Sequence, residues 1–274
     1  MGRLMDRSRA KKPFAKKSFG QNFLVDPKYI GRIIDALALT EGDTVVEIGA
    51  GRGALTESLI EKAGKVLAIE LDRDLVPLLS SQFGSHANFE LIDADALTLD
   101  FTALVPSDKK AKLVANLPYN ISTAILQRLI EHRWAFSEMV LMFQREVVHR
   151  ITAKPGNADR GFLTMLVESA FNAAKLFDVP GKAFNPPPDV TSSVVRLVPI
   201  DSGITDEKLF RKLVSQGFMQ KRKNLSNNFK ATLPNANELM TVIGIDPNRR
   251  AETLTLDEWI GFADVIAERQ KPDR

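Results

Sequence analysis

Residues 44–64, TVVEIGAGRGALTESLIEKAG, carry the clearest structural signal in this 274-residue chain. The β-branched run at 44–48 predicts a buried strand, and 54–63 predicts a helix that Gly64 ends. The glycines of 49–53 join the two, since glycine lets the backbone turn tightly and approach a ligand closely. The stretch therefore predicts a strand, a ligand-binding turn and a helix in direct succession.

Strands and helices alternate on the C-terminal side of this unit. Further strands are predicted at 66–70, 89–92, 113–115 and 139–143, with helices through 75–79 and 121–130. This alternation indicates a mostly parallel α/β sheet with helices on both faces. A helix at 162–171 and two late strands at 174–179 and 193–199 predict an antiparallel edge.

The pattern changes near residue 203, where apolar residues recur every three or four positions, and Thr255–Glu258 forms a capping box. We predict three parts: a basic N-terminal tail (1–18), a main domain (19–202) and a small all-helical domain (203–274).

Bulk composition narrows the functional classes. The chain carries a net charge of +3 and has no cysteine, which excludes disulfides, thiolate metal sites and cysteine nucleophiles. No apolar run approaches the ~20 residues of a membrane span, and no secretory signal is visible, so we expect a cytoplasmic protein. The three histidines share no metal-like spacing, so no metal is expected. Basic clusters in the tail and at 221–223 suggest a polyanion partner, although both also suit solvated surface.

An acidic residue follows the glycine turn at the distance typical of an adenosine site. Glu70 ends the next strand, where a carboxylate can accept the hydroxyls of a ribose. Asp95, after the third strand, can accept from an adenine amine or can cap a helix. The glycines also fit a dinucleotide site or a structural turn. With Glu47, however, the turn resembles the first motif of class I S-adenosylmethionine (SAM) methyltransferases, whose cationic cofactor suits nearby carboxylates.

The stretch NLPYNIS (116–122) follows the fourth strand, where ligands bind in an open parallel sheet. The side-chain oxygen of Asn116 and the carbonyl of Leu117 can accept the N–H bonds of an exocyclic amine and so localise its lone pair. Pro118 fixes the turn, and Tyr119 offers a face on which a flipped-out base can stack. The alternative is an Asn-capped turn beside a core tyrosine.

The motifs together resemble the KsgA-type (RsmA) small-subunit rRNA adenine dimethyltransferases. The resemblance spans nearly the whole chain and rests on FGQNFL (19–24), VEIGAGRGALT (46–56), IELDRDL (69–75), DADAL (93–97), NLPYNIS (116–122), FNPPPDVTSSVVRL (184–197) and KRKNLSNN (221–228). It implies a Rossmann-like class I methyltransferase fold and SAM as cofactor. It also implies dimethylation of two adjacent adenosines in the 3′-terminal hairpin of 16S rRNA during assembly of the 30S subunit, by an enzyme that we expect to be a monomer.

The resemblance also implies roles for single residues. The SAM site would be lined by Asn22, Leu24, Gly49, Glu70, Asp95 and Asn116. Phe184 would pack on the target adenine opposite Tyr119, whereas its residue type alone favours a place in the core. Lys221, Arg222 and Lys223 would contact rRNA phosphates, which position the RNA without specifying its sequence.

Three other hypotheses remain open from the sequence. One is the related family that methylates 23S rRNA. Another is a non-catalytic RNA-binding or assembly factor with the same fold, and the last is an NAD-dependent enzyme.

Overall fold

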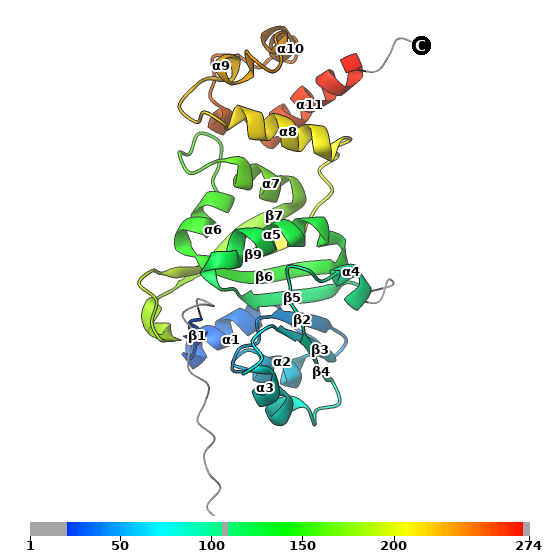
Figure 1. Ribbon diagram of the computed structural model, residues 1–274, viewed down its shortest axis with the longest axis vertical. Coiled ribbons are helices and arrows are strands. Elements are labelled where there is room, and N and C mark those ends of the chain that lie inside the picture. Colours follow the sequence, from blue (N-terminus) through cyan, green and yellow to red (C-terminus); the bar gives the residue numbers. More distant parts are fainter. Residues whose placement is uncertain (1–20, 106–108, 271–274) are drawn as a thin grey trace, which may run out of the picture.

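The computed structural model describes residues 21–105 and 109–270. The basic tail predicted at 1–18 lies outside the described residues, as do the first two residues of FGQNFL. The described chain forms an elongated molecule, with a sheet flanked by helices in its main part and the last four helices gathered at one end (Figure 1).

The centre of the main part is a seven-stranded sheet with the order β4-β3-β2-β5-β6-β9-β7. Its strands are β2 (Thr44–Ile48), β3 (Lys65–Glu70), β4 (Phe89–Asp93), β5 (Ala111–Asn116), β6 (Phe136–Gln144), β7 (Phe171–Val179) and β9 (Ser192–Pro199). Strand β9 pairs antiparallel with both neighbours, and the other strand pairs of this sheet are parallel. The late strand pair therefore forms an edge as predicted, with β7 outermost and the opposed strand β9 just inside it.

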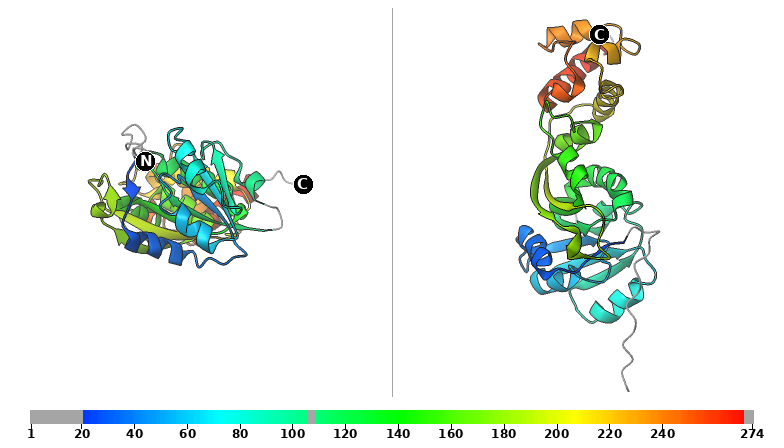
Figure 2. Two further views of the ribbon diagram at one scale, coloured as in Figure 1. Left: turned by 90° about the horizontal axis from the view of Figure 1, so that it is seen from below. Right: turned by 90° about the vertical axis from the view of Figure 1, so that its left-hand side faces the viewer.

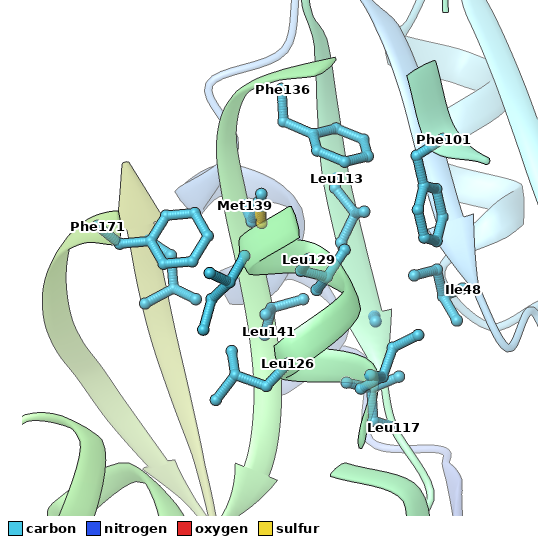
Figure 3. Close-up of a cluster of buried hydrophobic side chains, with 14 of the residues drawn as sticks. Ile48, Phe101, Leu113, Leu117, Leu126, Leu129, Phe136, Met139, Leu141 and Phe171 are labelled. Carbon is cyan, nitrogen blue, oxygen red and sulfur yellow. The ribbon is translucent and has the colours of Figure 1, made fainter. Parts of the chain in front are cut away.

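Helices cover both faces of the sheet. The main part contains α1 (Pro27–Ala36), α2 (Thr56–Lys62), α3 (Val76–Phe83), α4 (Phe101–Leu104), α5 (Ser122–Glu131), α6 (Arg145–Ile151) and α7 (Phe162–Ala170). Successive strand residues point to opposite faces, so Val45 packs in the cluster of α1–α3 and Val46 in the cluster of α5 and α7. Figure 3 shows Leu126 and Leu129 of α5 over Leu113 of β5, in the second of these clusters.

Asp26 caps α1 and Pro27 is its first residue, since the Asp26 carboxylate accepts a hydrogen bond from the amide of Lys28. A second, two-stranded sheet lies just before this helix. It pairs β1 (Phe23–Leu24) with β8 (Phe184–Asn185) across about 160 residues of sequence.

The C-terminal helices α8 (Glu207–Gly217), α9 (Leu225–Phe229), α10 (Ala236–Val242) and α11 (Leu256–Gln270) lie beyond α7 (Figure 2, right). Thr255 and Glu258 make both hydrogen bonds of the predicted capping box at the start of α11. Trp259 and Phe262 of α11 share a buried cluster with Met165 of α7, so these helices pack on the main part through one continuous core.

Arg160 adds polar contacts to the junction between the main part and the C-terminal helices. Its guanidinium is fully buried, donates to the carbonyls of Ala153 and Leu254, and lies 2.7 Å from a carboxylate oxygen of Glu168. Leu254 belongs to the segment before α11, so the buried cation connects the two parts of the chain. Among the described residues, no helix has the length and apolar character that a membrane crossing needs.

Candidate functional site: a cavity at the carboxyl ends of the parallel strands

The glycine turn between β2 and α2 depends on backbone conformations that favour glycine. Gly49, Gly51 and Gly53 have φ angles of 73°, 62° and 81°. The turn is fixed to the neighbouring strand because the Gly49 amide donates to the carbonyl of Ile69 over 2.8 Å. A Cβ atom on Gly53 would lie 2.3 Å from the ring of Phe83, so this glycine also lets α3 approach the turn.

Glu70 ends β3 and holds the turn from the side. Its carboxylate accepts three backbone amide hydrogen bonds, from Gly51 at 2.8 Å, Leu71 at 3.0 Å and Asp72 at 2.9 Å. A carboxylate has about four acceptor positions, so about one remains for a ligand hydroxyl. Glu70 is therefore both a brace for the turn and a candidate ribose acceptor.

Glu47 has a different environment from the one that its sequence position suggested. Its side chain is buried, and the hydroxyl of Thr56 at the start of α2 donates to it over 2.6 Å. Burial raises the pKa of Glu47 from 4.5 to about 7, and the nearby charge of Glu70 adds to this effect while the Thr56 bond opposes it. Glu47 is not on the wall of the cavity described below. Its bond with Thr56 instead joins the end of β2 to the start of α2, beneath the turn.

A cavity of about 340 Å³ opens beside the turn at the carboxyl ends of β2, β3, β4 and β5. It brings together most of the residues that the sequence proposed for a cofactor site: Asn22, Gly49, Glu70, Asp95 and Asn116. Leu117 and Tyr119 lie on the same wall. Residues from five separate segments of sequence thus converge on one hollow of the size typical of small-molecule sites.

The charges on the cavity wall have one sign. Glu70, Asp72 and Asp95 are acidic, and no lysine or arginine lies among the described residues that line the cavity. Asp95 also caps the turn that follows it, because one of its carboxylate oxygens accepts from the amide of Leu97 over 2.9 Å. The helix cap that the sequence offered as an alternative for Asp95 does not form, because the next helix, α4, starts at Phe101 and is capped by Asp100.

Asn116 is the last residue of β5, and its side chain is fixed from the N-terminal segment. The amide nitrogen of Asn116 lies 3.4 Å from the carbonyl oxygen of Asn22 and donates to it. Because the nitrogen is engaged there, the amide oxygen faces away from Asn22. This orientation suits an acceptor for a substrate N–H group.

Tyr119 follows in a short 3₁₀ turn, Tyr119–Ile121, and its ring is half-buried on the cavity wall. Its hydroxyl is 2.7 Å from the hydroxyl of Ser192, the first residue of β9. Burial raises the pKa of Tyr119, so the phenol is neutral near pH 7. A neutral ring held at its far end provides a flat face beside Asn116.

Leu24 and Phe184 are not on the cavity wall, in contrast to the roles that the family resemblance gave them. They pair with each other in the small β1–β8 sheet, and both are buried, with exposures of 3% and 4%. The Pro-rich segment around Phe184 folds this side chain into the cluster under α1, so the interpretation as a core residue fits the structure.

Several wall residues were not predicted from the sequence, among them Phe23, Leu71 and the acidic Asp72. The ring of Phe23 lies against Gly51, with the Arg52 guanidinium 4.1 Å from its centroid, and Leu71 exposes 47% of its surface at the cavity. The signal for Leu71 was its position directly after Glu70 at a strand end. Phe23 lies inside the quoted FGQNFL motif, but nothing in its residue type separates a wall residue from a core residue.

The predicted RNA-contacting residues Lys221, Arg222 and Lys223 are exposed on the turn between α8 and α9. The ammonium of Lys221 donates to the carbonyl of Ala158, in the segment between α6 and α7. The turn is thereby attached to the main part of the molecule. No group of three metal-ligating side chains comes together within residues 21–105 and 109–270.

Comparison with known proteins agrees with the geometry. A family model described as ribosomal RNA adenine dimethylase matches residues 14–268. The curated "Ribosomal RNA small subunit methyltransferase A" of Pseudomonas aeruginosa is 43% identical over 93% of this chain and 95% of its own length. The protein of that name from Alcanivorax borkumensis is also 43% identical, over 91% and 89% of the two lengths.

Solved structures share the fold. A dimethyladenosine transferase from Plasmodium falciparum superposes with a TM-score of 0.78 at 27% identity, over 90% of this chain and 98% of its own. The 23S rRNA methyltransferase ErmE gives 0.69 at 23% identity, over 90% and 100%, and at that identity it supports the fold alone. The family match spans both the sheet and the C-terminal helices, and it confirms the resemblance found in the motifs. This chain belongs to the ribosomal RNA adenine dimethylase family.

Proposed function

We propose that this protein transfers methyl groups from SAM to the exocyclic amines of two adjacent adenosines in the 3′-terminal hairpin of 16S rRNA. The substrate is the small ribosomal subunit or its precursor in the cytoplasm, and the enzyme acts as a monomer. The observation that carries the proposal is the position of Asn116, Leu117 and Tyr119 at the end of β5, on the wall of an acidic cavity beside the glycine turn.

The cavity fits SAM better than a dinucleotide. Its described wall has three carboxylates and no cationic side chain, which suits a sulfonium and an ammonium and offers nothing to neutralise a pyrophosphate. Glu70 has acceptor capacity left for a ribose hydroxyl, and Asp95 lies on the wall for the adenine amine. Bound there, the cofactor supplies an electrophilic methyl group.

The chain's own residues prepare the nucleophile. The exocyclic amine of adenine is a poor nucleophile because its lone pair is delocalised into the ring. The oxygen of Asn116 and the carbonyl of Leu117 accept its N–H bonds, which favours a pyramidal nitrogen with a localised lone pair. The methylated amine is acidic enough to release its proton to water, so no strong general base is required.

Tyr119 holds the target adenine during the methyl transfer. A nucleotide that leaves its stack loses base–base contacts, and stacking on an aromatic side chain returns about 1–3 kcal/mol. The exposed cations of 221–223 would bind phosphates and position the RNA. In this proposal, the shape of the ribosomal subunit determines which nucleotides reach the enzyme, and the cavity residues carry out the methyl transfer.

The test is to incubate the protein with labelled SAM and 30S subunits from a strain that lacks adenine dimethylation, and then to map the modified nucleotides. We expect dimethyladenosine at two neighbouring positions near the 3′ end, with no incorporation into naked 23S rRNA. Asn116→Ala should lower the rate at saturating SAM at least about 100-fold while 30S binding is retained. Unchanged methylation by this variant would refute the role of Asn116, and incorporation into 23S rRNA alone would refute the substrate.

A further inference from the structure

Tyr119 lies on a segment that gives its ring little support. The 3₁₀ turn is three residues long, and its local side-chain contact is the bond from the Ser122 hydroxyl to the Tyr119 carbonyl over 2.9 Å. That bond fixes the backbone and leaves two side-chain torsions to orient the ring. The direction of the ring faces is therefore decided at the far end of the side chain, where the Tyr119 hydroxyl meets the Ser192 hydroxyl at 2.7 Å.

Ser192 is a rigid anchor because of the direction of β9. This strand runs against the rest of the sheet, so its first residue arrives at the carboxyl ends of the parallel strands, where the cavity opens. Ser192 pairs with Gln144 at the end of β6 and with Val179 at the end of β7. Its side chain is fully buried, so its hydroxyl has no alternative partner in water.

We propose that Ser192 is a positioning residue for the methyl transfer, because its hydroxyl holds the Tyr119 ring in the orientation on which the target base stacks. The inference rests on the proposed function and adds a residue outside the cavity wall to it. Without the bond, the ring samples other orientations, and the base has to order it at the moment of binding. The loss would therefore appear in kcat/KM for 30S subunits and not in SAM affinity.

The neighbouring residue provides a matched control. Ser193 lies on the same strand and is also fully buried, but its hydroxyl bonds to the carboxylate of Asp178 on β7. Ser193→Ala and Ser192→Ala thus remove the same atom from adjacent buried positions. Only Ser192→Ala removes a contact to Tyr119.

The experiment is a double-mutant cycle on methylation of 30S subunits that lack the modification. Ser192→Ala and Tyr119→Phe remove the same hydrogen bond from its two ends, and Phe keeps the aromatic face. We expect each to lower kcat/KM for 30S subunits by about 3- to 10-fold, and the double variant to lose no more than either single variant. Ser193→Ala should stay within about twofold of wild type, and SAM affinity should be unchanged in all four proteins.

The outcomes separate this inference from the proposed function. A wild-type protein that binds SAM but does not methylate 30S subunits refutes the function itself. If the wild type is active, a normal rate for Ser192→Ala, or losses that multiply in the double variant, would overturn the positioning role. If Ser192→Ala fails to fold, Tyr119→Phe still tests the bond through the half-buried ring, and a normal rate for that variant overturns the proposal.

Discussion

Replacing Glu47 by Gln should stabilise the protein above neutral pH. Glu47 is buried, and its pKa in the folded protein is raised from 4.5 to about 7, with burial as the largest cause. The difference between the pKa values of the unfolded and the folded state corresponds to about 3 kcal/mol of unfolding free energy, because one pKa unit is equivalent to about 1.4 kcal/mol. Gln carries no charge, and its side-chain oxygen can still accept the bond from Thr56.

The direction of the pH effect on stability depends on whether the folded or the unfolded state releases the Glu47 proton first. Below pH 4.5 both the folded and the unfolded wild type carry the proton, and Glu47 makes no pH-dependent contribution. Between pH 4.5 and about 7 the unfolded state releases the proton and the folded state keeps it, so the wild-type free energy of unfolding falls. Above about pH 7 the full loss of about 3 kcal/mol remains.

The assay is urea unfolding of wild type and Glu47→Gln at several values between pH 4.5 and pH 8. The difference in unfolding free energy should move in favour of Gln by about 3 kcal/mol across that range. Glu57→Gln, which removes an exposed carboxylate from the first turn of α2, is the control for losing one acidic group. A difference between Glu47→Gln and wild type that stays constant with pH would refute the reasoning.

Three further substitutions test other parts of the structure. Gly53→Ala should destabilise the fold by about 1–3 kcal/mol in chemical denaturation, since it combines a positive φ with a clash against Phe83; a wild-type midpoint would contradict this. Arg160→Met should cost about 2–3 kcal/mol in the same assay because it removes a fully buried guanidinium that bonds the carbonyls of Ala153 and Leu254 and pairs with the partly exposed Glu168; a neutral effect would show that apolar packing replaces these contacts. Arg222→Ala should weaken 30S binding and lower the slope of log affinity against log salt by about one; an unchanged slope would remove it from the RNA contact.

The fold could be predicted because its strands carry local signals. The β-branched run at 44–48 became β2 without change, and the strands on either side were displaced by at most a few residues. The pairing of Leu24 with Phe184 had no local signal, because it joins two-residue strands from distant parts of the chain. This strand pair holds Phe184 against α1, so its side chain is buried there and not on the cavity wall beside Tyr119.

The candidate site could be predicted where residue type and position at a strand end agree. Glu70 and Asn116 end parallel strands, Asp95 comes shortly after one, and all three line the cavity. Glu47 shows the limit of this reasoning. Its acidic type suggested a contact with the cofactor, whereas its side chain is buried beneath the turn and accepts a hydrogen bond from Thr56.

The junction between α7 and the C-terminal helices has a mechanical consequence. Met165 is packed in the core of those helices, the Gly156 amide donates to the Glu252 carbonyl, and the buried Arg160 reaches Leu254, so apolar packing and hydrogen bonds both oppose bending at this joint. The span from the basic turn at 221–223 to the cavity is then a fixed length. Under the proposed function, the enzyme would then act as a gauge of fixed span, which accepts only a subunit whose two contact points already lie at the matching separation.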